Sequence, residues 1–238
     1  MAENSVAEST TDIIAKGELR YLVAEELKLA ASLLYQAYYD DPLLMDLFQA
    51  HKPDYEKRLR ATVREELAAF WEAQQPMIGV FDGDSLLGVA CLTRPGKSFG
   101  PGRYWHWRLK MLLTAGYVST MQLVDKELLI QQAMQQSLGE QLADNDYHML
   151  AFLAVHPRYQ QNGWGDLLVR AASQALADDQ QSAGIAVYVT IDNHLKLFFQ
   201  HGYQVVQELM VGEVAGRLLF CPRQAAQQSQ YEESADAI

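Results

Sequence analysis

The sequence predicts an α/β protein in which helices flank a sheet of mixed strand direction. Short apolar runs of strand length alternate with longer segments whose apolar residues recur at helical spacing. Two of the short runs, 77–81 and 86–92, are joined by Asp82-Gly83-Asp84, which is typical of a hairpin turn. A hairpin requires antiparallel neighbours. It therefore argues against a flavodoxin-like or other phosphate-binding domain with an all-parallel sheet.

The N-terminal part is predicted to contain one short strand and two helices before this hairpin. The strand covers 19–23, and apolar residues at helical spacing predict the first helix over 25–39. Asp40-Asp41-Pro42 should end that helix, because proline disfavours helical geometry in the residue before it. A longer amphipathic helix is predicted over 54–73, with Asp54 as its N-cap.

A loop rich in glycine and proline, residues 94–102, separates the hairpin from a mostly helical segment over 103–144. The start of this segment is basic and aromatic, a composition that also suits a helix lying on a membrane. Packing against the core or over a substrate cleft is the favoured interpretation, because the apolar residues recur at helical spacing.

The C-terminal part is predicted to complete the sheet. After the apolar run Leu150 to Val155, a helical pattern begins near Leu167, and a further strand covers 185–190. A short helix over 193–201 ends at Gly202. The closing strands are predicted over 203–211 and 217–221.

Composition bounds the class of protein. With 238 residues, 49% of them apolar, the chain can bury one sizeable core, and flexible tails are expected at 1–17 and 224–238. A formal net charge of −11 argues against a nucleic-acid partner. Neither a signal peptide nor an apolar run of membrane-spanning length is visible. The only cysteines are Cys91 and Cys221, and neither has other potential metal ligands near it in the sequence. We therefore expect a cytoplasmic protein with no metal and no membrane partner.

The loop between the central strand and its helix has the features of an anion site. It reads Gln160-Gln161-Asn162-Gly163-Trp164-Gly165. The first N–H groups of a helix have no partner within it, and the helix dipole places partial positive charge there. The loop lacks the lysine and Ser/Thr of a nucleoside-triphosphate loop and the three-glycine dinucleotide pattern. The predicted anion is therefore neither ATP nor NAD.

This loop resembles the acyl-CoA motif of the GNAT superfamily of N-acetyltransferases. The family pattern of Gln or Arg, two residues, Gly, one residue, Gly or Ala is met by Gln160, Gly163 and Gly165. The lead-in Ala154-Val155-His156-Pro157 and the segment AYYDDPLLMDLF are also similar to that family. The resemblance implies one GNAT domain over 18–223, with a mostly antiparallel central sheet flanked by helices. It also implies that the helical insertion, about 103–144, precedes the motif strand and shapes the acceptor pocket.

The resemblance further implies that acetyl-CoA lies in a splayed opening between the motif strand and the next strand. Its pyrophosphate would sit on the loop, its pantetheine would pair with strand backbone, and its acetyl group would pass to a primary amine of a small molecule or protein by direct attack in a ternary complex. The cofactor-binding residues implied in this way are Leu153, Val155, Arg158, Gln160, Gln161, Asn162, Gly163, Trp164, Gly165, Asn193 and Phe198. Asp166, in the first helical turn, is expected to point away from the pyrophosphate.

The general base and general acid are not identified by the sequence. Regular alternation would place Tyr147, Met149, Ala151, Leu153 and Val155 on one strand face, and His148, Leu150, Phe152 and Ala154 on the other. The inward positions that often carry Glu or His in relatives are then apolar. Phe198 stands where many relatives carry a tyrosine acid, and phenylalanine has no proton to donate.

The weak catalytic candidates are Tyr188, Thr190 and His194 as proton donors and Asp41 at the acceptor side. Because these assignments are incomplete, a catalytically silent acyl-CoA-binding regulatory module remains the alternative. His148 is expected to be a packed or surface histidine. We expect a homodimer only because the resemblance to the family implies one.

Overall fold

The structure is a computed structural model that describes residues 17–95, 109–113, 116–138 and 146–226. The expected N-terminal tail up to residue 16 and the C-terminal tail from 227 lie outside the described residues. Most of the 94–102 loop and both ends of the helical insertion also lie outside them. Residues 223–226 form a helical turn in which Ala226 is buried, so the folded part continues past the expected limit at 223.

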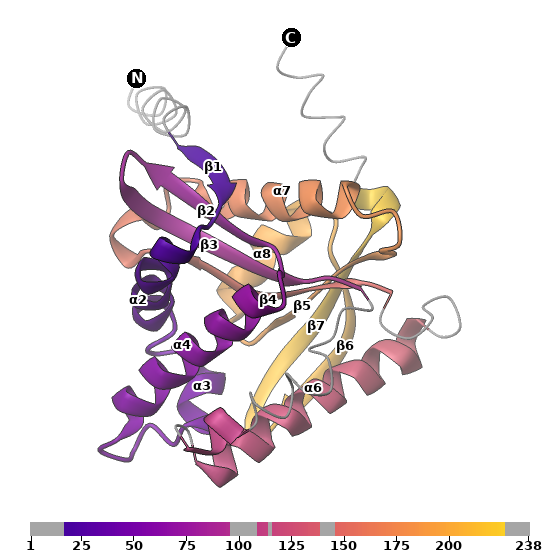
Figure 1. Ribbon diagram of the computed structural model, residues 1–238. Coiled ribbons are helices and arrows are strands. Elements are labelled where there is room, and N and C mark those ends of the chain that lie inside the picture. The colour runs from indigo at the N-terminus through magenta and orange to yellow at the C-terminus, as the bar shows by residue number, and fades with distance from the viewer. Residues whose placement is uncertain (1–16, 96–108, 114–115, 139–145, 227–238) are drawn as a thin grey trace, which may run out of the picture.

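Seven strands of the described chain form one sheet in the order β1-β2-β3-β4-β5-β7-β6 (Figure 1). They are β1 (Glu18–Tyr21), β2 (Met77–Asp82), β3 (Ser85–Thr93), β4 (His148–Val155), β5 (Gly184–Val189), β6 (Gln204–Val211) and β7 (Val214–Pro222). Strands β4 and β5 run parallel, and all other neighbouring pairs are antiparallel. The expectation of a mostly antiparallel sheet is confirmed.

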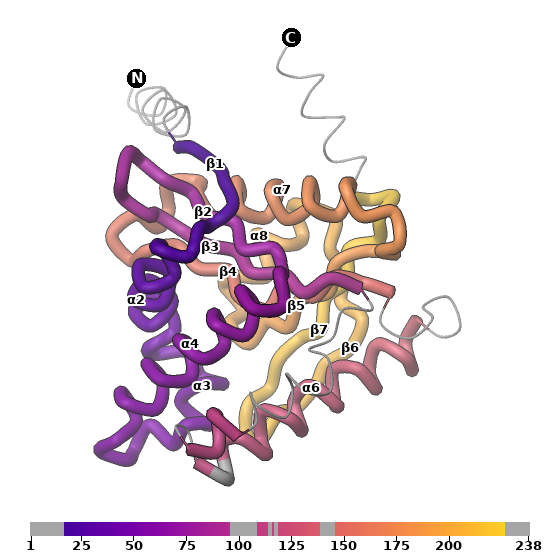
Figure 2. Tube along the Cα trace, in the orientation of Figure 1, coloured from indigo at the N-terminus to yellow at the C-terminus, as the bar shows by residue number. Residues whose placement is uncertain are grey.

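Helices cover both faces of the sheet (Figures 1 and 2). They are α2 (Leu27–Ala37), α3 (Pro42–Leu47), α4 (Tyr55–Glu72), α6 (Tyr117–Leu138), α7 (Trp164–Ala177) and α8 (Asp192–Gln200), with 3-10 turns η1 (Ala24–Glu26) and η3 (Pro157–Tyr159). Helices α7 and α8 share one buried cluster with the sheet, whereas α2, α3, α4 and α6 pack on the opposite face. The two faces are therefore separate layers around the central strands.

Helix α3 was missed by the sequence analysis, which placed only a turn after the first helix. Asp41 caps α3 by accepting a hydrogen bond from the Leu44 N–H at 3.0 Å, and Pro42 occupies the first helical turn. Both residue types favour a helix start as much as a helix end. Asp54 does stand at the start of α4, but its carboxylate accepts from Arg58 Nε at 2.8 Å and does not cap the helix.

A β-bulge in β4 overturns the predicted alternation of faces. Cys91 of β3 pairs with Phe152, whereas the next residue, Leu92, pairs with Leu150, so Ala151 is one extra residue in β4. The alternation of side chains shifts by one residue beyond the bulge. Met149, Phe152 and Ala154 consequently share the face of α2, α4 and α6, and Leu150, Leu153 and Val155 share the face of α7.

The sheet opens between β4 and β5 directly after this point. The two strands pair only at His148 with Ile185 and at Met149 with Ala186. From Leu150 to Val155, β4 has no strand partner on the β5 side, because β5 continues beside β7. The splayed opening implied by the resemblance is thus a feature of this fold, and the bulge lies at its closed end.

Candidate functional site

The loop that follows β4 holds its shape with its own residues. Gln160 Nε2 donates to the Val155 carbonyl and Asn162 Nδ2 donates to the Tyr159 carbonyl, both at 3.2 Å. Gly163, the N-cap of α7, has φ +80°, in the left-handed region that disfavours residues with a Cβ. The glycine at this position is therefore required by the backbone itself.

The amides of this loop point to no protein acceptor. The first hydrogen bond of α7 joins the Leu167 N–H to the Gly163 carbonyl at 3.1 Å. No backbone N–H of residues 161–165 donates to any residue in the described part of the chain. Five unpaired N–H groups at the positive end of a 14-residue helix are available to an anionic ligand.

Trp164 and Gly165 differ in how tightly the protein packs around them. The Trp164 side chain is buried, and it lies so close to Gly17 that a Cβ at Gly17 would overlap the indole ring. Trp164 therefore anchors the loop through its side chain and offers only its backbone to a ligand. A Cβ at Gly165 would lie 3.4 Å from the Leu197 side chain, an ordinary van der Waals distance, so packing of α8 against α7 does not require glycine here.

Asp166 is held by two protein partners. His201 Nε2 lies 2.7 Å from Asp166 Oδ1, and Arg170 Nε donates to Asp166 Oδ2 at 2.8 Å. Burial raises the pKa of Asp166, but the hydrogen bonds from His201 and Arg170 outweigh it and leave the pKa below its usual value. The carboxylate is thus ionised and tied to the end of α8.

The remaining candidate residues for cofactor binding and catalysis on η3 and α8 lie in different environments. Arg158 is exposed on η3 beside the loop, and its guanidinium makes no ion pair with the described residues. Asn193 and His194 are exposed in the first turn of α8. Phe198 is buried and packs edge-on against Tyr203 at 5.2 Å between ring centres, within the cluster under α7. His194 and Phe198 do not line the cavity described next.

A cavity of about 380 Å³ lies on the opposite face of the sheet, at the closed end of the splayed opening. Its wall is mainly apolar and comes from α3, α4, α6 and the bulged part of β4. The apolar residues that form it include Leu43, Leu44, Phe48, Leu59, Val63, Phe70, Leu123, Ile130 and Phe152. The described part of the helical insertion, α6, therefore forms one side of the cavity.

Three carboxylates line this cavity: Asp41, Glu66 and Glu127. Asp41 is fixed at both oxygens, because Oδ1 accepts from the Leu44 N–H and Oδ2 accepts from Thr190 Oγ1 at 3.3 Å. Glu66 and Glu127 were not found from the sequence, because nothing in their helices distinguishes them from solvent-facing acids.

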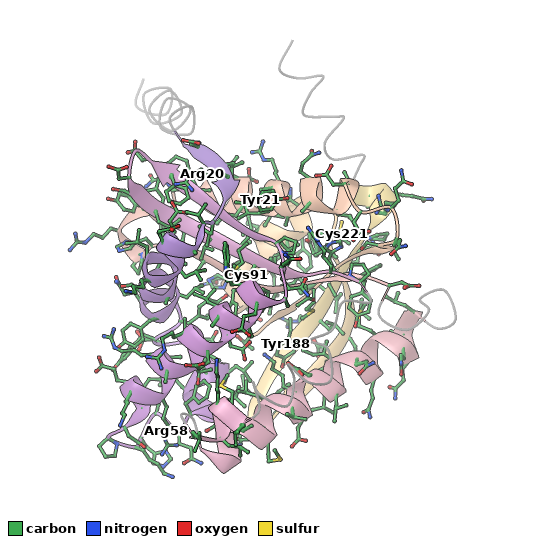
Figure 3. The ribbon with its side chains drawn as sticks, viewed as in Figure 1. Arg20, Tyr21, Arg58, Cys91, Tyr188 and Cys221 are labelled. Carbon is green, nitrogen blue, oxygen red and sulfur yellow. The ribbon has the colours of Figure 1, made fainter. Side chains whose placement is uncertain are left out.

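Of the predicted catalytic candidates, the structure brings Asp41, Tyr188 and Thr190 together at this cavity. Tyr188 projects from β5 toward α6 (Figure 3), and its hydroxyl donates to the Leu209 carbonyl at 3.3 Å. Thr190 directly follows β5 and lines the same cavity. Asp41 reaches the same point from the turn between α2 and α3.

Tyr38 is a further residue that the sequence analysis did not find. Its hydroxyl accepts from the Leu153 N–H and donates to the Leu153 carbonyl, both at 3.1 Å. Leu153 lies on the edge of β4 that has lost its β5 partner. Tyr38 also lines the cavity, so one side chain contacts both the cavity and the strand edge.

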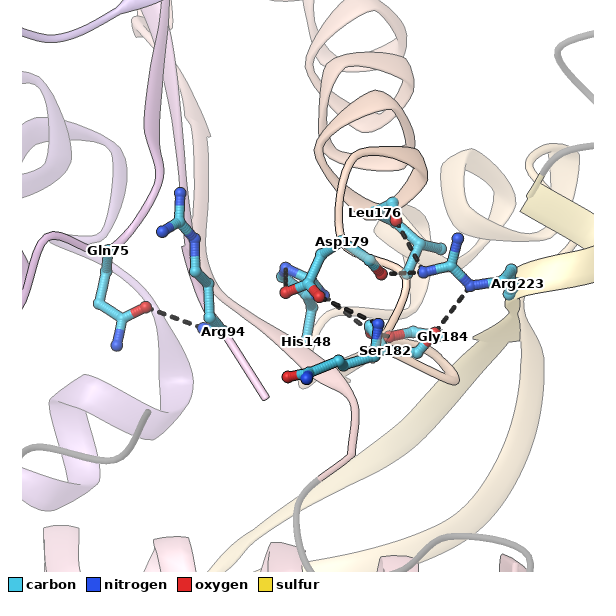
Figure 4. Close-up of polar contacts among 9 residues, drawn as sticks. Gln75, Arg94, His148, Leu176, Asp179, Ser182, Gly184 and Arg223 are labelled. Carbon is cyan, nitrogen blue, oxygen red and sulfur yellow. Dashed lines mark hydrogen bonds and ion pairs between the residues drawn. The ribbon is translucent and has the colours of Figure 1, made fainter. Parts of the chain in front are cut away.

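His148 lies outside this cavity, in a buried polar cluster (Figure 4). Ser182 Oγ donates to the Gly184 carbonyl at 3.0 Å, so the 2.8 Å contact with His148 requires that His148 Nδ1 carries the proton. Burial lowers the pKa of His148 to about 4, although Asp179, 3.9 Å from Nε2, opposes the shift. His148 is therefore a neutral, packed imidazole and not part of a nucleophilic triad, because the serine proton is already used.

The described residues contain no candidate metal cluster, no disulfide and no helix of membrane-spanning length. Within the described ranges, no three His, Cys, Asp or Glu side chains are placed to hold a metal ion. Cys91 and Cys221 are free, buried thiols on different strands (Figure 3). No helix in the described part of the chain is long and apolar enough to span a bilayer.

Comparisons with known proteins agree with this geometry. A family model described as the acetyltransferase (GNAT) family matches residues 44–203. A histone acetyltransferase HPA2-related structure from Corynebacterium glutamicum is 13% identical, with a TM-score of 0.61 over 87% of this chain and 96% of that one. A mosquito arylalkylamine N-acetyltransferase like 5b is 16% identical, with a TM-score of 0.61 over 87% of this chain and 99% of that one.

A PaiA N-acetyltransferase from Thermoplasma acidophilum, solved with coenzyme A, is 13% identical, with a TM-score of 0.52 over 87% of this chain and 98% of that one. These identities show the likeness of fold. A comparison with curated protein sequences gives no match.

Proposed function

Because the chain belongs to the acetyltransferase (GNAT) family, we propose that it transfers an acetyl group from acetyl-CoA to a primary amine. The proposal is carried by one observation: five unpaired loop amides at 161–165 adjoin a strand edge that has lost its partner. The loop amides can donate hydrogen bonds to a diphosphate. An extended pantetheine arm can hydrogen-bond to the unpartnered edge of β4 as an added strand would. The similar fold solved with coenzyme A supports this choice of cosubstrate.

The cofactor residues of this proposal act mainly through their backbone. Gln161, Asn162, Gly163, Trp164 and Gly165 would donate N–H groups to the diphosphate, and Arg158 is placed to add a charge beside them. Gln160 shapes the loop through its bond to Val155. Leu153 and Val155 would present peptide groups to the arm. Phe198 would contribute only packing beneath α8, because it is buried there.

In the proposed reaction the amine nitrogen attacks the thioester carbonyl, so that a C–N bond forms, the C–S bond breaks and CoA leaves as a thiolate. We propose Asp41 as the base that takes the ammonium proton. Its carboxylate lines the cavity and is oriented by Leu44 and Thr190. A base held at a fixed position near the attacking nitrogen contributes about 10²–10⁴-fold to such reactions.

The proposed acceptor is a small amine with an apolar, preferably aromatic, body. The cavity has the volume of a small-molecule site and is walled by leucine and phenylalanine side chains. Its lining holds three carboxylates, Asp41, Glu66 and Glu127, and two cations, Arg94 and Lys126, so the excess of one negative charge favours a cationic amine over an anion. The structural likeness to an arylalkylamine N-acetyltransferase agrees with this class of acceptor.

A thiol-release assay with acetyl-CoA and a panel of amines tests the proposal. We expect the highest kcat/KM with arylalkylamines, lower values with aliphatic polyamines and the lowest with lysine peptides. Calorimetric binding of CoA without turnover of any amine would instead support the silent regulatory module. Turnover of peptides alone would contradict the small-molecule acceptor.

A further inference from the structure

Tyr38 occupies the part of the strand edge that the cosubstrate would need. The Leu153 N–H and carbonyl point away from β3, toward the side where β5 has departed, and the Tyr38 hydroxyl satisfies both. No other residue that the structure describes hydrogen-bonds to these two groups. The phenol therefore forms the hydrogen bonds with the Leu153 backbone that a neighbouring strand would form.

The position of Leu153 along β4 indicates which part of acyl-CoA belongs there. The diphosphate site at 161–165 adjoins the far end of β4, near Val155, and the amine cavity adjoins the bulge at Ala151. An arm that runs from the diphosphate to the cavity passes Val155 first and Leu153 last. The group that reaches Leu153 is then the reactive end of the arm, whose carbonyl oxygen needs an N–H donor.

We propose that the Tyr38 hydroxyl holds the place of the acyl-CoA thioester carbonyl and that acyl-CoA displaces it on binding. This inference rests on the proposed function. A neutral phenol can fill both roles, because it accepts from the Leu153 N–H and donates to the Leu153 carbonyl. In the complex, the thioester carbonyl would accept from the N–H and one water would donate to the carbonyl. Burial raises the pKa of Tyr38 and the Asp41 charge raises it further, so the phenol stays neutral at ordinary pH.

Displacement of Tyr38 also alters the amine site, because Tyr38 is part of the cavity wall and its ring lies edge-on to Phe152, with 5.8 Å between ring centres. The wall that the amine meets after acyl-CoA binding then differs from the wall before it. Tyr38 is in this sense a positioning residue that links the two substrate sites.

Calorimetry with two ligands on the full chain tests the inference. Acetyl-CoA carries the pantetheine arm and the thioester carbonyl, whereas adenosine 3′,5′-bisphosphate carries neither. For Tyr38→Phe we expect acetyl-CoA to bind roughly threefold to tenfold more tightly, because two hydrogen bonds no longer have to be broken. The bisphosphate should bind with unchanged affinity. Tyr39→Phe, which removes the hydroxyl of the exposed next residue, should leave both affinities unchanged.

The other outcomes contradict the inference in separable ways. Equal or weaker acetyl-CoA binding by Tyr38→Phe would show that Tyr38 does not compete with the thioester end of the arm. A parallel change for both ligands would show a general effect on the fold. If the unaltered protein binds neither ligand, the proposed function itself fails.

Discussion

The two sites that we propose along strand β4 are made in different ways. At the C-terminal end of the strand, the proposed anion site consists of consecutive peptide groups, shaped by Gly163 and a helix start. At the bulge, the proposed acceptor cavity consists of side chains from α3, α4, α6 and β5, far apart in the sequence. A backbone site depends on local conformation and should fail at once when that conformation is blocked. A cavity site should respond to substitution by degrees.

Replacing Gly163 with valine should have the largest effect. A β-branched residue is strained at φ +80°, so the loop amides should lose their alignment and CoA affinity should fall more than 100-fold, by calorimetry. Gly83→Val is the matched control, because Gly83 also has a positive φ, at +56°, and nothing lies near it. That variant should lose stability but keep its affinity. Undiminished CoA binding by Gly163→Val would remove the loop assignment.

Asp41→Asn should come next, with a fall of about 100-fold in kcat/KM for the amine and little change in CoA affinity. Asparagine can still cap α3 and meet Thr190, so the loss would report the base and not the fold. Asp40→Asn, at the exposed neighbouring residue, is the control. An unchanged kcat/KM for Asp41→Asn would exclude this base.

The paired end of β4 should respond to pH through stability alone. His148 has a folded-state pKa of about 4, below its unfolded value near 6.5, so the unfolded chain binds the extra proton first. Its contribution is present above pH 6.5 and is lost as pH falls toward 4. Between pH 7 and 5.5 the loss should be about 1–2 kcal/mol in urea denaturation. His148→Gln should flatten this slope, and an equal slope in both proteins would contradict the assignment.

Thr190→Val should have the smallest effect. It removes the hydroxyl that donates to Asp41 at 3.3 Å but keeps the shape of the side chain. We expect kcat/KM to fall about threefold to tenfold, through kcat, because the base is less well oriented. Steady-state kinetics measures this split. A loss as large as that of Asp41→Asn would mean that Thr190 itself handles the proton.

The same division decides what the sequence could predict. The anion loop was predicted because Gln160, Gly163 and Gly165 lie within six residues of one another, and the hairpin was predicted from its turn. Tyr38 and Leu153 are 115 residues apart, and only the completed fold shows that they meet. The bulge at Ala151 leaves no mark in an apolar run, yet it reversed the predicted faces from Phe152 onward. Helix α3 is different, because Asp41 and Pro42 did signal it and were interpreted only as a stop.

The additional residue at Ala151 has a consequence for how this chain can vary. Removing Ala151 itself would abolish the bulge but leave Leu153 and Val155 on the face of α7, whereas removing a residue between Phe152 and Val155 would turn the following side chains to the other face. Exchanges between apolar residues of similar volume would leave that geometry in place. Natural variation in this strand should therefore consist of replacements, whereas changes in its length should be eliminated by selection for activity.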